Sequence, residues 1–107
     1  MLNIQKMMQQ AKLVQEKLEE IQEKLKDIDV SGASGDGLVR VTMSCANVVR
    51  SVTIDPSLLN AGGKDMLEVL VVAAMNNAGE AKDVRVKEET RKMMDSIGVD
   101  ENTKFPF

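Results

Sequence analysis

The sequence predicts an α+β protein with a long helix, a three-stranded antiparallel sheet, a short helix and a second long helix, in that order. Three observations lead to this class. Apolar residues follow a seven-residue repeat over the first quarter of the chain, and apolar and polar residues alternate in the next quarter. From residue 64 to about residue 97 there is no proline and only one glycine, which favours a long helix.

The first helix is expected from about Asn3 to Asp27, with Asn3 as its N-cap. Its apolar residues are spaced three and four apart, which is typical of a coiled-coil seam. These residues are Ile4, Met7, Ala11, Val14, Leu18, Ile21, Leu25 and Ile28. A helix of about 25 residues is roughly 37 Å long, more than one small core can cover. Part of it should therefore project as an arm.

Residues 38–44 and 48–54 predict two strands joined by a hairpin around residues 45–47. Val30 is expected to add a short third strand, and one face of this sheet should be apolar while the other is mainly polar. Arg50 falls in the apolar phase of the last strand. Its position predicts either a bulge or an edge strand.

The segment Gly32–Gly37 contains three glycines with the spacing GxxGxG and leads into a strand. This spacing differs from the GxGxxG pattern of dinucleotide-binding proteins. We interpret the glycines as turn or bulge residues. The alternative is that one of them allows a ligand to approach the backbone closely.

Asp55 and Pro56 predict the start of a short helix, and the second long helix is expected from Lys64 to about Ile97. Apolar residues surround this helix between residues 66 and 75, so both of its sides should be buried. One side can cover the sheet of its own chain, and a second copy with twofold symmetry is the simplest cover for the other. The candidate dimer residues are Leu67, Leu70, Val71, Ala74 and Met75. The same helix should pair with the seam of the first helix through Ala74, Ala78, Ala81, Met93 and Ile97.

The composition excludes several classes of enzyme. Without histidine and with a single cysteine, Cys45, the chain cannot form a His/Cys zinc site, a disulfide or a histidine-based triad. We interpret the carboxylate pairs Glu19/Glu20 and Glu88/Glu89 as solvated helix surface. The sequence thus predicts no enzymatic activity, no cofactor, no metal and no small-molecule substrate. It also predicts no membrane association and a cytoplasmic location.

Basic residues on the two long helices are the candidates for nucleic-acid binding. They are Lys6, Lys12 and Lys17 on the first helix and Lys82, Arg85, Lys87, Arg91 and Lys92 on the second. Such cations can meet a phosphate backbone, but they can also form part of a balanced solvated surface. The net charge of −3 leaves both interpretations open.

The order of elements and the strings SGASGDGLVRVTM, SVTIDPSLL and MLEVLVVAAMNNA resemble the YbaB/EbfC family of bacterial nucleoid-associated proteins. The resemblance covers nearly the whole chain, and the final Phe105-Pro-Phe107 is similar to the family's ending. Met75 stands where the family often has phenylalanine. The domain organisation that follows is one YbaB/EbfC-like domain over residues 1–97 and a flexible C-terminal tail over residues 98–107.

This resemblance implies a cytoplasmic, nucleoid-associated homodimer that is shaped like tweezers, with projecting helical arms. Such a protein is not an enzyme. It binds double-stranded DNA with loose sequence preference, organises the nucleoid and can affect gene expression. By the same resemblance, the basic residues of both long helices carry the DNA contacts, and Arg40 and Arg50 form a second candidate region on the sheet.

An alternative function is a coiled-coil interaction module or a prefoldin-like holdase without DNA binding. Helix, hairpin, helix is also the order of elements in prefoldin-like subunits. Four methionines near the expected arm tips, Met7, Met8, Met93 and Met94, fit this alternative because flexible thioethers suit promiscuous apolar surfaces.

Overall fold

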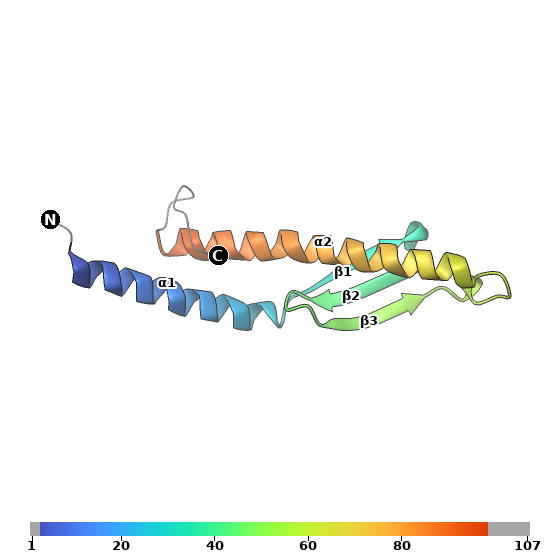
Figure 1. Cartoon of the computed structure of the whole chain (residues 1–107), viewed down its shortest axis with the longest axis horizontal. Helices are drawn as coiled ribbons and strands as arrows, with labels where there is room; N and C mark the ends of the chain where they lie inside the picture. The colour runs from blue at the N-terminus through green and yellow to red at the C-terminus, as the bar shows by residue number, and fades with distance from the viewer. Residues whose placement is uncertain (1–2, 99–107) are drawn as a thin grey trace.

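The computed structural model describes residues 3–98 and has the predicted α+β arrangement (Figure 1). The elements are α1 (Ile4–Leu25), β1 (Asp29–Ser34), η1 (Gly35–Gly37), β2 (Val39–Ser44), β3 (Val49–Ile54), η2 (Pro56–Leu58) and α2 (Lys64–Ser96). The molecule is elongated, with principal extents of 73 × 23 × 18 Å. The tail predicted for residues 98–107 lies outside the described residues except for Gly98.

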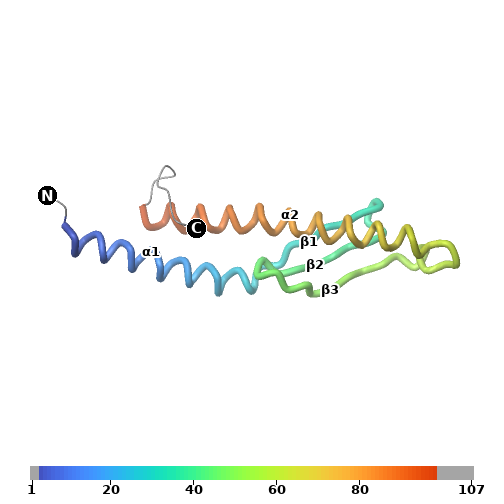
Figure 2. The backbone as a smooth tube through the Cα atoms, in the orientation of Figure 1, coloured from blue at the N-terminus to red at the C-terminus, as the bar shows by residue number. Residues whose placement is uncertain are grey.

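The two long helices lie side by side and run in opposite directions, and α1 extends beyond the C-terminal end of α2 (Figure 2). Asn3 caps α1 as predicted, because its side-chain oxygen accepts a hydrogen bond from the Lys6 amide over 3.2 Å. The run of apolar residues from 69 to 72, which by composition also suits a strand, is helical. Within residues 3–98, neither helix is long and apolar enough to span a bilayer.

The three strands form an antiparallel sheet in the order β1-β2-β3. The register shifts between β2 and β3, because Thr42 pairs with Ser51 whereas Met43 pairs with Val49. Arg50 is therefore the extra residue of a bulge, and it also lies on an edge strand. Both alternatives predicted for Arg50, a bulge and an edge strand, are therefore confirmed.

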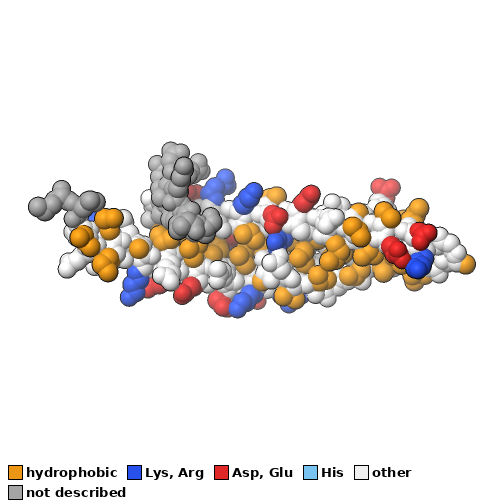
Figure 3. All heavy atoms as spheres, in the orientation of Figure 1, with side chains coloured by type: hydrophobic (Ala, Val, Ile, Leu, Met, Phe, Trp, Pro, Cys, Tyr) orange, Lys and Arg blue, Asp and Glu red, His pale blue; other side chains and the backbone are white. Residues whose placement is uncertain are grey.

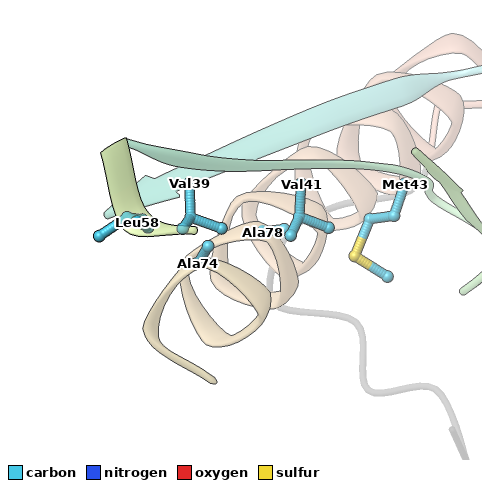
Figure 4. Packing of buried hydrophobic residues seen from close by; sticks show 6 residues of the cluster. All are labelled: Val39, Val41, Met43, Leu58, Ala74 and Ala78. Atoms are coloured by element: carbon cyan, nitrogen blue, oxygen red, sulfur yellow. The ribbon is translucent and has the colours of Figure 1, made fainter. Parts of the chain in front are cut away.

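One face of the sheet packs against the N-terminal half of α2, which covers β1 and β2. The core between them consists of Val39, Val41, Met43, Leu58, Ala74 and Ala78 (Figure 4). The same face of β3 is covered only in part. Ile54 packs against this core, whereas Val52, which pairs with the fully buried Val41, is 45% exposed. The sheet thus has an uncovered apolar edge beside α2.

Gly32 allows the backbone of α2 to approach β1 closely. A Cβ atom at this position would lie 2.6 Å from the carbonyl oxygen of Ala74 and 2.7 Å from the Cα of Ala78. Two hydrogen bonds between β1 and α2 flank this close contact. The Ser34 hydroxyl donates to the Leu70 carbonyl over 2.6 Å, and the Asn77 amide donates to the carbonyl of residue 33 over 2.8 Å.

The other two glycines of this segment have the predicted role. Gly35 and Gly37 have φ angles of +58° and +91°, in the left-handed region that glycine adopts without strain, and they form the turn between β1 and β2. For Gly32 the interpretation as a turn or bulge residue is wrong. It is a residue of close approach, as in the alternative, but its partner is the chain's own helix.

A second cluster joins the end of α1 to the C-terminal half of α2. Ile21 and Leu25 pack against Met93 and Cys45, and Leu18 and Ile97 lie at the margin of this cluster. Burial raises the pKa of the Cys45 thiol, which therefore stays protonated near neutral pH.

The pairing expected between the α1 seam and α2 is correct only at its C-terminal end. Met93 and Ile97 pack on the seam as predicted. Ala74 and Ala78 instead pack on the sheet, because α2 passes over β1 and β2 before it reaches α1. The seam residues before Leu18 thus lie beyond the part of α1 that α2 covers.

The Gly32→Ala substitution should destabilise the fold. The added methyl group would meet helix backbone, which cannot rotate away as a side chain can. We expect a loss of about 1 to 3 kcal/mol in the free energy of unfolding, the usual range for overpacking. Urea denaturation followed by circular dichroism measures it.

Gly62→Ala is the matched control, since no atom lies within 4 Å of the Cβ position at Gly62. This control should be neutral or stabilising by up to about 1 kcal/mol. Equal unfolding midpoints for the two variants would contradict the close-contact explanation.

Candidate nucleic-acid interface

Glu89 is the centre of an ion cluster that links α1 to α2. Its side chain is only 3% exposed. Three cations surround its carboxylate: Lys24 Nζ lies 2.8 Å from Oε2, and Arg85 Nε and Lys92 Nζ lie 3.1 and 3.7 Å from Oε1. Because Lys24 belongs to α1 and the other two to α2, the cluster connects the helices at the base of the arm.

Hydrogen bonds from Lys24 and then Arg85 lower the pKa of Glu89 from its ordinary value of 4.5 to about 2. The carboxylate is therefore charged at neutral pH and compensates one of the three positive charges around it. The interpretation of Glu88 and Glu89 as a solvated pair is wrong for Glu89, while Glu88 is exposed. The partner that changes its environment, Lys24, is 65 positions away and was not among the candidate residues.

A groove of about 270 Å³ lies beside this cluster, between α1 and α2. Its lining includes three lysines, Lys17, Lys24 and Lys92, and two carboxylates, Glu20 and Glu89. Lys17 also pairs with Glu20 over 3.1 Å. The two carboxylates thus compensate only part of the positive charge of the three lysines in the groove.

Four of the other candidate cations on the long helices are exposed and form no ion pair with any residue in the range 3–98. Two of these, Lys6 and Lys12, lie on α1, and the other two, Lys87 and Arg91, lie on α2. Lys87 and Arg91 are four residues apart and share one side of the helix. Both residues are two positions from Glu89 along α2, which is a rotation of about 200° around the helix. Their side chains therefore point away from the Glu89 cluster. Basic side chains accordingly lie on the outer edges of both helices in the arm region, and on α1 they alternate with acidic ones (Figure 3).

Two of the three remaining basic candidates, Lys82 and Arg50, are bound by other residues of the chain. Lys82 donates to Asn47 Oδ1 over 2.8 Å and pairs with Asp83 over 3.0 Å. Arg50 lies 3.3 Å from Asp29 and donates to the carbonyl of residue 26 over 2.7 Å, which ties β3 to the end of α1. Arg40 is exposed on the face of the sheet opposite α2.

The candidate dimer residues on α2 differ in exposure. Ala74 is fully buried against the chain's own sheet, and Leu67, Leu70 and Val71 are half-buried beside the same core. Met75 is 38% exposed. More exposed apolar residues of α2 that were not among the candidates are Met66, Val69 and Val72. These exposed residues alternate along α2 with apolar residues that pack on the sheet, so this part of the helix is apolar on all sides.

Comparison with known proteins identifies the family. The profile of the YbaB/EbfC DNA-binding family matches residues 1–97. The chain belongs to this family. An uncharacterized protein from Helicobacter pylori has a similar solved structure, with a TM-score of 0.74 and 21% sequence identity over 88% of this chain and 99% of the other. That similarity supports the fold.

Membership of the YbaB/EbfC DNA-binding family supports a nucleoid-associated DNA-binding role and points to a protein that is not an enzyme. DNA is thus the partner that the family indicates. The exposed cations on α1 and α2 are the groups in the described structure that suit such a partner.

The depressed pKa of Glu89 gives a pH-dependent contribution to stability. Because the folded-state pKa lies below the ordinary value, the contribution is present above pH 4.5 and is lost as the pH falls towards about 2. Glu89→Gln should lower the melting temperature at pH 7. The difference from the unmodified protein should shrink between pH 4.5 and 2, as scanning calorimetry can measure.

Glu88→Gln is the control, because Glu88 is an exposed neighbour outside the cluster. It should change the melting temperature little at any pH. A Glu89→Gln protein that melts like the unmodified protein at pH 7 would show that the cluster does not stabilise the arm.

Proposed function

We propose that this protein is a cytoplasmic, nucleoid-associated protein that binds double-stranded DNA as a homodimer, mainly through the phosphate backbone. The binding has loose sequence preference, organises the nucleoid and affects gene expression. The family match over residues 1–97 supports the DNA-binding part of this proposal. The observation that carries the phosphate-directed mode is the set of exposed cations on the outer edges of both arm helices.

These cations differ in how readily they can bind phosphate. Lys6, Lys12, Lys87 and Arg91 are exposed and form no ion pair within residues 3–98, so a phosphate need not displace a carboxylate from them. Arg85 and Lys92 already compensate Glu89. We therefore assign the main contacts to the first four residues, and we place Arg40 on the sheet as a separate, weaker candidate.

Loose sequence preference follows from the chemistry of these groups. Lysine contacts with phosphates position a protein on DNA without reading the bases. The chain contains no tryptophan or tyrosine, and both phenylalanines lie in residues 99–107, so stacking on bases has few possible donors. A phosphate-directed complex is also sensitive to salt.

The homodimer in this proposal uses the open apolar surface between α2 and β3. Lys82 of α2 reaches the hairpin between β2 and β3, and Met75 lies seven residues earlier on the same side of the helix. Exposed valines of β3, Val49 and Val52, continue this surface. A broad exposed apolar surface of this kind is typical of a protein interface, and a second copy covers it by twofold symmetry.

The Lys87→Gln/Arg91→Gln double variant tests the phosphate contacts. If each side chain neutralises one phosphate, a dimer loses four contacts, and the slope of log K against log salt should become less steep by about 3 to 4. The affinity at low salt should fall as well. A gel-shift titration over several salt concentrations measures both quantities.

The control is Lys26→Gln/Lys64→Gln, which makes the same charge change at exposed lysines away from the proposed contact surface. It should leave the slope nearly unchanged. Equal effects of the two double variants would contradict the assignment. If the unmodified protein forms no complex even at low salt but suppresses aggregation of an unfolded client, the holdase alternative replaces DNA binding.

The Val72→Glu/Met75→Glu variant tests the dimer surface. Both residues are exposed in the single chain, so the substitutions should leave its fold intact. Burying four carboxylates at the interface is unfavourable. We expect the dissociation constant of the dimer to rise at least 100-fold in sedimentation experiments.

Val84→Glu is the control, because Val84 is 58% exposed on α2 beyond the part that covers the sheet. This variant should remain dimeric. An unmodified protein that sediments as a monomer at high concentration would overturn the homodimer, and a double variant that stays dimeric would move the interface elsewhere.

A further inference from the structure

The first half of the coiled-coil seam on α1 is mostly exposed. Ile4 and Met7 are 69% and 54% exposed, and Ala11 is exposed as well. Val14, the next seam residue, is half-buried. We call these four residues the arm-tip seam. The end of α1 that projects past α2 shows a group of apolar side chains on its surface (Figure 3).

The arm-tip seam has the same spacing of apolar residues as the part of α1 that packs against α2. Leu18, Ile21 and Leu25 have the same three-four spacing and pack against the C-terminal end of α2. The cover stops because α2 ends at Ser96, which lies beside Lys17 in the groove between the helices. The apolar stripe therefore extends about one and a half heptads beyond its helical partner.

The chain continues beyond this point for nine residues, 99–107, which contain its only two aromatic side chains, Phe105 and Phe107. Gly98 has a φ angle of +75° and its amide donates to the carbonyl of Asp95, so the chain leaves the helix axis here. The following segment starts at the boundary between covered and uncovered seam.

The distances allow this segment to reach the whole arm-tip seam. Thirteen residues of α1 separate Lys17 from Ile4, a helical distance of about 20 Å. Seven residues separate Gly98 from Phe105, and in extended conformation they span up to about 23 to 25 Å. Phe105 can therefore reach any position between Val14 and Ile4.

We propose that residues 99–107 fold back onto the arm-tip seam of their own chain and place Phe105 and Phe107 between its apolar residues. The charges are complementary. Residues 3–15 carry two lysines and no acid, whereas residues 99–107 carry Asp100 and Glu101 against Lys104. The segment takes the place along the seam that α2 leaves open, on the same part of α1 as Lys6 and Lys12, which are also proposed DNA contacts.

The chain's own segment is favoured over a second copy as the occupant. A flexible link of seven residues keeps the phenylalanines at an effective concentration in the millimolar range near the seam. An intermolecular pairing of two arm tips uses only four seam residues from each chain, and helices this short associate weakly in water. The intrachain contact is therefore independent of protein concentration.

A single tryptophan tests the proposal, because the natural chain has neither tryptophan nor tyrosine. In the full-length Phe105→Trp protein, emission should be blue-shifted relative to free tryptophan. The acrylamide quenching constant should be at least twofold lower than in the same protein that also carries Met7→Gln and Ala11→Gln. Emission should not change on dilution.

The matched control adds Met8→Gln and Leu13→Gln instead, which are exposed α1 positions off the seam. These substitutions should leave the emission and quenching of the introduced tryptophan unchanged, and circular dichroism should show the same helix content in both backgrounds. Emission typical of water-exposed tryptophan in the parent, or no response to the seam substitutions, would overturn the proposal. A red shift on dilution would also overturn it, in favour of contact between two copies.

Discussion

The close backbone contact between α2 and β1 determines where the other elements lie. Without a side chain at Gly32, the helix comes near enough for Ser34 to bond directly to a helix carbonyl. This contact fixes the direction of α2 relative to the sheet. The helix has 33 residues, about 50 Å, whereas a six-residue strand spans only about 20 Å. The part of α2 that overhangs the sheet is therefore the part on which α1 can pack.

Local sequence patterns predicted the elements because each pattern is decided by neighbouring residues. The seven-residue repeat gave α1, and Asn3 gave its start. The alternation of apolar and polar residues gave β2 and β3, including the irregularity at Arg50. The partners of these elements could not be obtained in the same way. Ala74 and Ala78 have the spacing of a helix-packing stripe whether they face α1 or the sheet, and only the path of the chain decides between the two.

The sequence was sufficient to identify the basic residues of the candidate site, but not to tell which of them pair with carboxylates of the chain. Every basic residue on a helix looks equivalent in the sequence, whereas the fold separates those that pair with carboxylates from those that form no ion pair within residues 3–98. Glu89 distinguishes the two groups, because it forms ion pairs with Lys24 of α1 and with Arg85 and Lys92 of α2. A buried carboxylate with partners on a distant helix has no local signature, because its partners are set by tertiary contact.

The uncovered apolar surfaces of the molecule differ in shape, and this difference separates their proposed partners. The surface beside α2 and β3 draws on a helix and a strand, so a second copy of similar shape can cover it. The arm-tip seam is a stripe on a single helix, narrow enough for a short extended segment. Lys87 and Arg91 lie apart from both, on the side of α2 that points away from the Glu89 cluster. Dimerisation and the phosphate contacts of Lys87 and Arg91 therefore use different sides of α2, whereas the docked tail shares α1 with Lys6 and Lys12, so tail docking and phosphate binding meet on the arm tip.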